Sequence, residues 1–181
     1  MSKIQIIENC SEVGAGTRGA SLSIDALKVA ARNLKSKLFK KYKSIEIPSN
    51  NDVLDQEIKF PKALRIESVI KVCENVSSAV SKSLSKHHFP LVIAADHSNA
   101  AGTLAGIKST YPDKRIGVVW IDAHADLHSP FTTPSGNVHG MSLAASTGSD
   151  NDQHRAHELD HLTQQQWEKY KNLENISPKV N

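Results

Sequence analysis

The residues best suited to chemistry lie directly after two apolar segments of the chain. Asp96 and His97 follow the first segment, and Asp122, His124 and Asp126 follow the second in an Asp-x-His-x-Asp run. If the backbone stays extended through that run, its period of two places all three side chains on the same side. Carboxylate and imidazole groups this close together repel or compete unless a cation holds them. The spacing predicts a metal site, and mixed ligands with no nearby cysteine suit Mn(II), Fe(II), Co(II) or Zn(II).

The segments that precede these residues are predicted to be buried strands. Residues 89–95 and 116–121 are continuous apolar runs, as expected for strands covered on both faces. A helix expected over residues 98–111 separates them, so the three elements should form a βαβ unit of a parallel sheet with a right-handed crossover. Ligands of such sheets bind beyond the carboxyl ends of the strands, which is where the candidate metal ligands fall.

The rest of the chain adds one strand and three helices to this α/β domain, which we expect to span residues 1–181 as a single unit. The strand is expected at 4–7 and the helices at 24–42, 63–86 and 157–173. The polar, proline-containing stretch between the first two helices is interpreted as a loop (residues 43–62). The apolar side of the first helix comprises Leu27, Ala30, Ala31, Leu34 and Leu38. The apolar stripe of the second comprises Ile66, Val69, Ile70, Cys73, Val76, Val80 and Leu84.

Composition limits the classes of protein to which the chain can belong. Its 181 residues are 39% hydrophobic and 23% charged, which favours one folded domain over a disordered chain. The net charge of +3 is too small to predict nucleic-acid binding, and no apolar run is long enough to cross a membrane. Two cysteines, Cys10 and Cys73, suit a reducing compartment better than a disulfide scaffold, so we expect a cytoplasmic protein.

Three motifs together resemble the arginase, or ureohydrolase, family, which also includes agmatinases and formimidoylglutamases. They are Asp96-His97-Ser98, the run from Trp120 to Asp126, and the Ser-Gly-Asn-Val-His-Gly run at 135–140. The last of these points most to arginases. The resemblance covers nearly the whole chain and implies a three-layer α/β/α fold of the arginase type with two manganese ions at the strand ends. It also implies a role in arginine metabolism: a metal-bridging hydroxide hydrolyses a guanidino or amidino carbon, turning arginine and water into ornithine and urea.

The resemblance also assigns roles to individual residues. His97, Asp122 and Asp126 would bind one manganese, and His124 would bind the other, with Asp122 bridging the two ions. The catalytic residues would be Asp126 and His139, of which the histidine would move protons near the product amine.

The same resemblance implies a site for the amino-acid end of the substrate. Ser135 and Asn137 match residues that contact the α-carboxylate and α-amino groups of arginine in arginases. His128 stands where arginases carry an asparagine that helps to read the carboxylate. Ala94 and Ala95 stand where the family usually has two glycines.

One expected element of the family is missing from the sequence, so alternatives stay open. The family has a later apolar strand that ends in Asp-x-Asp, whereas the only such run here, Asp150-Asn151-Asp152, lies in a polar loop. One ion would therefore keep three protein ligands and the other two. The alternatives are formimidoylglutamase or agmatinase activity, or a truncated, catalytically inactive fragment that binds metal. The partner is expected to be a small guanidino or amidino compound, and a homo-oligomer is left open.

Two further patterns are rejected as sites. The run Gly14-Ala-Gly16-Thr-Arg-Gly19 matches G-x-G-x-x-G, but six residues separate it from the preceding strand, and the dinucleotide-binding turn follows its strand at once. The set His154, His157 and His161 has helical spacing, but charged neighbours favour an ordinary solvated surface.

Overall fold

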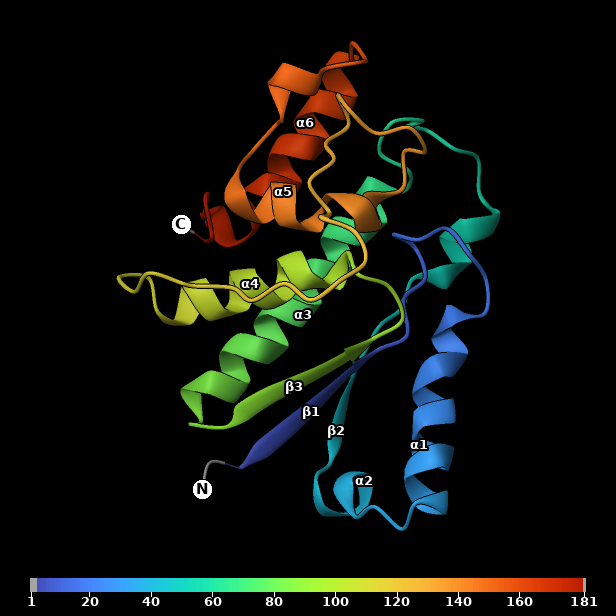
Figure 1. Cartoon of the computed structure of the whole chain (residues 1–181), viewed down its shortest axis with the longest axis vertical. Helices are drawn as coiled ribbons and strands as arrows, with labels where there is room; N and C mark the ends of the chain where they lie inside the picture. The colour runs from blue at the N-terminus through green and yellow to red at the C-terminus, as the bar shows by residue number, and fades with distance from the viewer. Residues whose placement is uncertain (1–2, 181) are drawn as a thin grey trace.

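A computed structural model describes residues 3–180 as a parallel sheet with flanking helices (Figure 1). The three strands are β1 (Ile4–Asn9), β2 (Ser44–Ile47) and β3 (Phe89–Ala94), in the spatial order β2-β1-β3. All pairs are parallel: Ile6 of β1 lies opposite Ser44, and Ile4 lies opposite Phe89. The predicted fold class is confirmed.

The helices connect the strands and cover the sheet. They are α1 (Ser23–Asn33), α2 (Leu38–Lys41), α3 (Ile66–Ser85), α4 (Asn99–Thr110), α5 (Ser142–Thr147) and α6 (His161–Lys171). Short 3₁₀ turns lie at Ala20–Leu22, Asn51–Asp55, Val138–Met141, Asp152–His154 and Leu173–Asn175. Within the described residues, no helix is long and apolar enough to cross a membrane.

The core forms where α3 packs between the sheet and α4. The predicted apolar stripe of α3 is buried from Ile66 to Val80, as expected from its period of 3.6 residues. On α4, Gly102 and Gly106 let the two helices approach closely. A Cβ atom at Gly102 would lie 2.6 Å from the carbonyl oxygen of Cys73, and one at Gly106 would lie 2.5 Å from that of Ser77. The helix α4, which lies in the sequence between His97 and the other candidate ligands, is therefore held tightly against α3.

The strand predicted at 116–121 does not form, which corrects the sequence-based expectation. The segment is an irregular trace in Figure 1, and Val119 and Ile121 leave 87% and 93% of their surface exposed. A groove of about 740 Å³ separates it from β3. An apolar run becomes a strand only when it pairs with another strand, and among the described residues 116–121 makes no backbone hydrogen bond to β3, the edge strand that faces it across the groove. The predicted βαβ unit consequently ends in a helix followed by an unpaired segment.

The first predicted helix and the loop after it also differ from the structure. Residues 24–42 divide into α1 and α2, because Lys35 adopts a left-handed backbone conformation (φ 56°). The expected apolar side of this helix is not buried, since Leu27 and Leu34 are 47% and 82% exposed. The predicted loop 43–62 contains β2, whose four residues are too few for a clear alternation.

The C-terminal region contains one predicted helix and one that was not predicted. The helix expected at 157–173 is α6, which begins later because the carboxylate of Asp160 caps it by accepting from the amide of Thr163. The helix α5 begins two residues after the Ser-Gly-Asn-Val-His-Gly run ends and has only six residues, too short for a periodic apolar pattern.

Candidate metal centre

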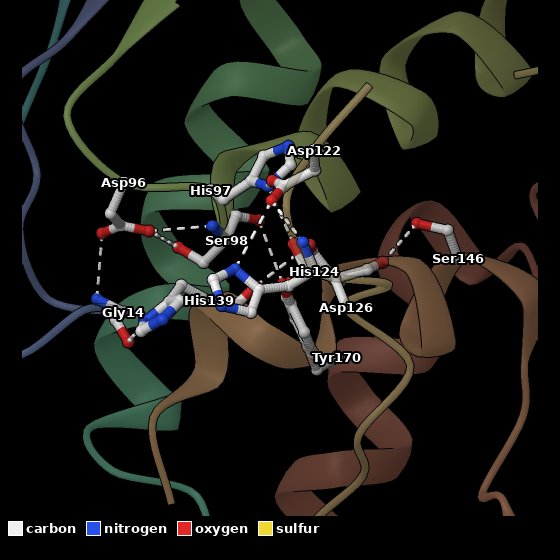
Figure 2. A network of polar contacts seen from close by, with 11 residues as sticks. Gly14, Asp96, His97, Ser98, Asp122, His124, Asp126, His139, Ser146 and Tyr170 are labelled. Carbon is white, nitrogen blue, oxygen red and sulfur yellow. Dashed lines mark hydrogen bonds and ion pairs between the residues drawn. The ribbon is translucent and has the colours of Figure 1, made fainter. Parts of the chain in front are cut away.

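Three of the four predicted metal ligands meet at the carboxyl end of β3. His97 lies in the loop between β3 and α4, while Asp122 and Asp126 lie in the irregular segment that follows residue 121. One ligand atom from each residue lies within 4.8 Å of the other two. Figure 2 shows the three side chains pointing toward one another from these separate segments. The structure therefore brings together the set that the resemblance assigns to one ion.

The histidine nitrogen stands between the two carboxylates. Nδ1 of His97 lies 2.8 Å from Oδ2 of Asp122 and 2.8 Å from Oδ2 of Asp126. The side chains are 39%, 23% and 5% exposed, respectively, so the cluster is open on the histidine side and closed on the Asp126 side. One imidazole nitrogen and two carboxylate oxygens form a donor set that suits a divalent cation of the manganese or zinc type.

The two carboxylates differ in electrostatic environment. Burial raises the pKa of Asp126, although nearby His97 opposes the shift. A hydrogen bond from the backbone amide of His124 lowers the pKa of Asp122. Asp122 is therefore the more readily ionised of the two and the better prepared to receive a cation.

The backbone of Asp126 is fixed independently of its side chain. Its φ of 51° lies in the left-handed region, which aspartate and asparagine tolerate better than most residues. Its carbonyl oxygen accepts hydrogen bonds from the amides of Leu143 and Ala144 in the first turn of α5. The hydroxyl of Ser142 also lies 3.5 Å from its carboxylate. The short helix α5, which was not predicted, thus sets the position of this ligand.

His124 is not part of the three-residue cluster. Its side chain is 84% exposed, and its Nδ1 lies 3.5 Å from Oδ1 of Asp122. Bends at residues 122–124 break the extended geometry that would have aligned the Asp-x-His-x-Asp run on one side. The role of His124 as ligand of a second ion stays a prediction.

The loop that carries His97 is held by contacts to its backbone and to its side chain. In the backbone, the carbonyl oxygen of Ser98 accepts from the thiol of Cys73 at 3.3 Å and from the hydroxyl of Tyr170 at 3.0 Å. At the side chain, Trp120 stacks on the His97 ring with the ring centroids 4.5 Å apart. Sequence reasoning assigned none of these contacts, because Tyr170 and Ser98 are 72 positions apart and no motif or periodic pattern links them.

A second hollow adjoins the ligand cluster and gathers the predicted substrate residues. It measures about 500 Å³, and Asp126 lies in its wall. The predicted residues that also line it are His124, His128, Ser135, Asn137 and His139. Nδ1 of His128 lies 3.1 Å from the hydroxyl of Thr132, and the hydroxyl of Ser135 accepts from the amide of Asn137 at 3.2 Å. The hollow therefore adjoins the ligand cluster through Asp126, which belongs to both.

His139 is held by the N-terminal glycine loop. Its backbone amide and its ring Nδ1 both lie 3.2 Å from the carbonyl oxygen of Gly14. Because a carbonyl oxygen can only accept, Nδ1 carries the hydrogen, and Nε2 is left as the ring nitrogen able to take up a proton.

The rejected patterns have structural roles. Nε2 of His157 lies 2.7 Å from the carbonyl oxygen of Thr133 and 3.3 Å from Nζ of Lys62. Asp150 accepts hydrogen bonds at 2.6 Å from both the Trp167 indole and the Lys171 ammonium, so it anchors α6. Among residues 3–180, only the His97 cluster groups three ligand-type residues in this way.

Fold and site together define a class of α/β proteins with a histidine–carboxylate cluster at the end of a parallel sheet. A family description reading "Arginase family" matches residues 3–172, and the chain belongs to that family. Arginases from Bacillus caldovelox and Bacillus subtilis are each 36% identical to it, over 82% and 80% of this chain. The match covers 50% and 48% of those relatives, so the chain spans about half of their length.

Solved arginase structures share the fold of this chain. The arginase of Bacillus caldovelox aligns with a TM-score of 0.74 and 28% identity, over all of this chain and 55% of its own. The arginase of Entamoeba histolytica, solved in complex with L-ornithine, aligns with a TM-score of 0.68 and 28% identity, over 88% of this chain and 56% of its own.

Proposed function

We propose that this chain carries the manganese- and substrate-binding residues of an arginase-like ureohydrolase, which converts arginine and water into ornithine and urea. The observation that carries the proposal is the convergence of His97, Asp122 and Asp126 beside a hollow lined by the predicted substrate contacts. Family membership supports the same reaction class.

The donor set fits the metal that the family resemblance implies. His97, Asp122 and Asp126 would hold one ion, and His124 with a bridging Asp122 would hold the second. Two bound cations would lower the pKa of a water molecule enough to make hydroxide available near neutral pH.

The chain's own residues would place the substrate and move a proton. Ser135, Asn137 and His128 line the hollow and would bind the α-carboxylate and α-amino end of arginine. The guanidino group would then lie toward Asp126. His139, which keeps its hydrogen on Nδ1 against Gly14, would use Nε2 to pass a proton toward the departing amine.

A second candidate, metal binding without catalysis, is favoured by the position of His124. Its exposed side chain lies outside the cluster. The first ion would have the buried Asp126 among its ligands, whereas neither predicted ligand of the second ion, Asp122 or His124, is buried. Agmatine and formimidoylglutamate are the alternative substrates, because His128 stands where arginases carry asparagine.

The test measures turnover and metal binding on the same protein. Urea release from arginine and agmatine, and formamide release from formimidoylglutamate, are followed with added Mn(II), while calorimetry counts the bound ions. Arginine hydrolysis with two bound ions supports the proposal. Binding of one ion without turnover of any substrate supports the non-catalytic candidate, and failure to bind Mn(II) contradicts both.

We further propose a cytoplasmic location. Cys10 and Cys73 are both free thiols, and burial raises the pKa of the Cys73 thiol to about 12, so it stays protonated and unreactive. Reduced cysteines of this kind suit a reducing compartment.

Size measurement in solution would decide whether the chain forms the homo-oligomer that the sequence left open.

A further inference from the structure

Asp96 precedes a predicted metal ligand but faces away from the ligand cluster. Its Oδ2 accepts from the backbone amide of Gly14 at 3.0 Å, and its Oδ1 accepts from the amide of Ser98 at 2.8 Å and from the Ser98 hydroxyl. Three donors from two distant segments therefore converge on one carboxylate (Figure 2). Such a carboxylate ties the N-terminal loop to the start of α4.

The contact requires glycine at position 14. A Cβ atom there would lie 2.5 Å from Oγ of Ser98 and 2.7 Å from Oδ1 of Asp96, closer than real Cβ atoms approach other atoms. The missing side chain lets the peptide of Gly14 reach the carboxylate. Its carbonyl oxygen is then presented to His139, which lies 125 positions away in the sequence.

We propose that Asp96 is a positioning residue for His139. Asp96 holds the amide of Gly14, and the carbonyl oxygen of Gly14 accepts from the backbone amide and from ring Nδ1 of His139. Asp96 thereby stabilises the tautomer of His139 that carries its hydrogen on Nδ1 and leaves Nε2 free to accept a proton. The functional meaning of this tautomer rests on the proposed ureohydrolase reaction, but the tautomer itself does not.

The chemistry of the carboxylate explains why its nearest isostere should fail. Both oxygens of an ionised aspartate accept, which matches donors on both sides. The side-chain amide of Asp96→Asn has one accepting oxygen and one donating nitrogen. Its nitrogen must therefore face the donor of either Gly14 or Ser98, and two donors cannot form a hydrogen bond. One arm of the bridge must open.

The test reads the His139 tautomer directly by nitrogen NMR. The ¹⁵N-labelled, metal-free chain is measured at a pH where the ring is neutral, and loss of signals in His139→Gln assigns the ring nitrogens. In the wild type we expect the hydrogen on Nδ1. In Asp96→Asn and in Gly14→Ala, we expect the ratio of Nδ1–H to Nε2–H forms to fall about fivefold, the factor that one hydrogen bond supports. Matched controls are Asp113→Asn, at an exposed position, and Gly117→Ala, where a Cβ would meet nothing within 4 Å.

Each outcome decides the inference. A wild-type ring with its hydrogen on Nε2 overturns it, whether or not the variants fold. An unchanged ratio in either folded variant also overturns it, as does an equal fall in the controls. The NMR experiment contains no metal or substrate, so a chain that fails to hydrolyse arginine can still confirm the role of Asp96. Conversely, a His139 ring with its hydrogen on Nε2 would overturn that role without deciding whether the chain is a ureohydrolase.

Discussion

The two segments that supply the candidate ligands differ in how the fold holds them. β3 is paired along its length, and the loop after it is bonded to α3 and α6 through the carbonyl oxygen of Ser98. The segment 116–122 has the same apolar character but lies across a groove of about 740 Å³ from the sheet. It reaches the site through the stacking of Trp120 on His97 and through Asp122, whose Oδ2 lies 2.8 Å from Nδ1 of His97. One side of the cluster is therefore built on the core, and the other is built on a loosely covered segment.

This difference shows that an apolar sequence does not by itself make a strand. Residues 89–94 become β3 because they pair with β1, whereas 116–121 lies across a groove from the other edge of β3 and does not pair with it. The ligand-bearing ends still converge, because Asp126 is anchored to the first turn of α5. A ligand can therefore be positioned in two ways. His97 directly follows a paired strand, whereas Asp126 follows an unpaired segment and is held by its own backbone hydrogen bonds to α5.

The largest effect is expected where the two segments meet. His97→Ala removes the nitrogen that stands between both carboxylates, so affinity for Mn(II) should fall at least about 100-fold. Calorimetry measures the change. His154→Ala, at an exposed position, should bind like the wild type. Equal affinity of the two variants would show that the cluster is not the metal site.

The next effect concerns a charge buried in the firmly packed region. The side chain of Lys179 is fully buried, and desolvation lowers its pKa from 10.5 to about 8. Between these values the unfolded chain binds more protons, so the free energy of unfolding should rise by about 3 kcal/mol from pH 8 to pH 10.5. Below pH 8 this gain is absent.

Urea denaturation across that pH range measures the effect. Lys179→Met should lose this rise, whereas Lys37→Met, at an exposed lysine, should keep it. Parallel pH profiles for the wild type and Lys179→Met would argue against the burial of a titrating ammonium group.

Two alanine substitutions compare the packing of the two regions directly. Gly102→Ala places a Cβ atom 2.6 Å from the backbone of Cys73, so it should lower the free energy of unfolding by about 2 kcal/mol. Gly117→Ala adds the same methyl group where nothing lies within 4 Å, and should leave stability unchanged. Urea midpoints measure both. If Gly102→Ala proves as stable as Gly117→Ala, α3 and α4 do not pack as closely as described.

The smallest effect is expected on the loose segment itself. Val119→Ser should change the free energy of unfolding by less than about 0.5 kcal/mol, because 87% of the side chain is already exposed. Hydrogen exchange gives a companion measurement: the amides of 118–121 should exchange faster than those of β3. Slow exchange in this segment, or a large loss of stability, would mean that it is paired in solution.

The sequence predicted the elements whose own pattern determines them. The stripe of α3 is long and periodic, and the run at 89–95 is apolar and bounded, so both were placed within a few residues. Motif spacing and the expected strand ends indicated a metal site among these residues, and the family resemblance singled out His97, Asp122 and Asp126 as the ligands of one ion. These features depend on local sequence and on a general property of parallel sheets.

The rest depends on contacts between distant segments. The failure of 116–121 to pair depends on the neighbours available, and the exposure of Leu34 depends on how α1 lies against the sheet. The bridge from Asp96 through Gly14 to His139 joins three segments that no periodic pattern connects. The only sequence signal for it was an aspartate directly before a predicted ligand.

The left-handed backbone of Asp126 restricts which residues can replace it over evolutionary time. A substitution there must satisfy a conformational demand and a chemical one at once, and few amino acids meet both. Asparagine would keep the conformation and abolish the charge, whereas glutamate would keep the charge and strain the chain. Loss of this ligand by drift should therefore run through asparagine, and a relative that carries asparagine here would be expected to keep the fold after its affinity for cations has decayed.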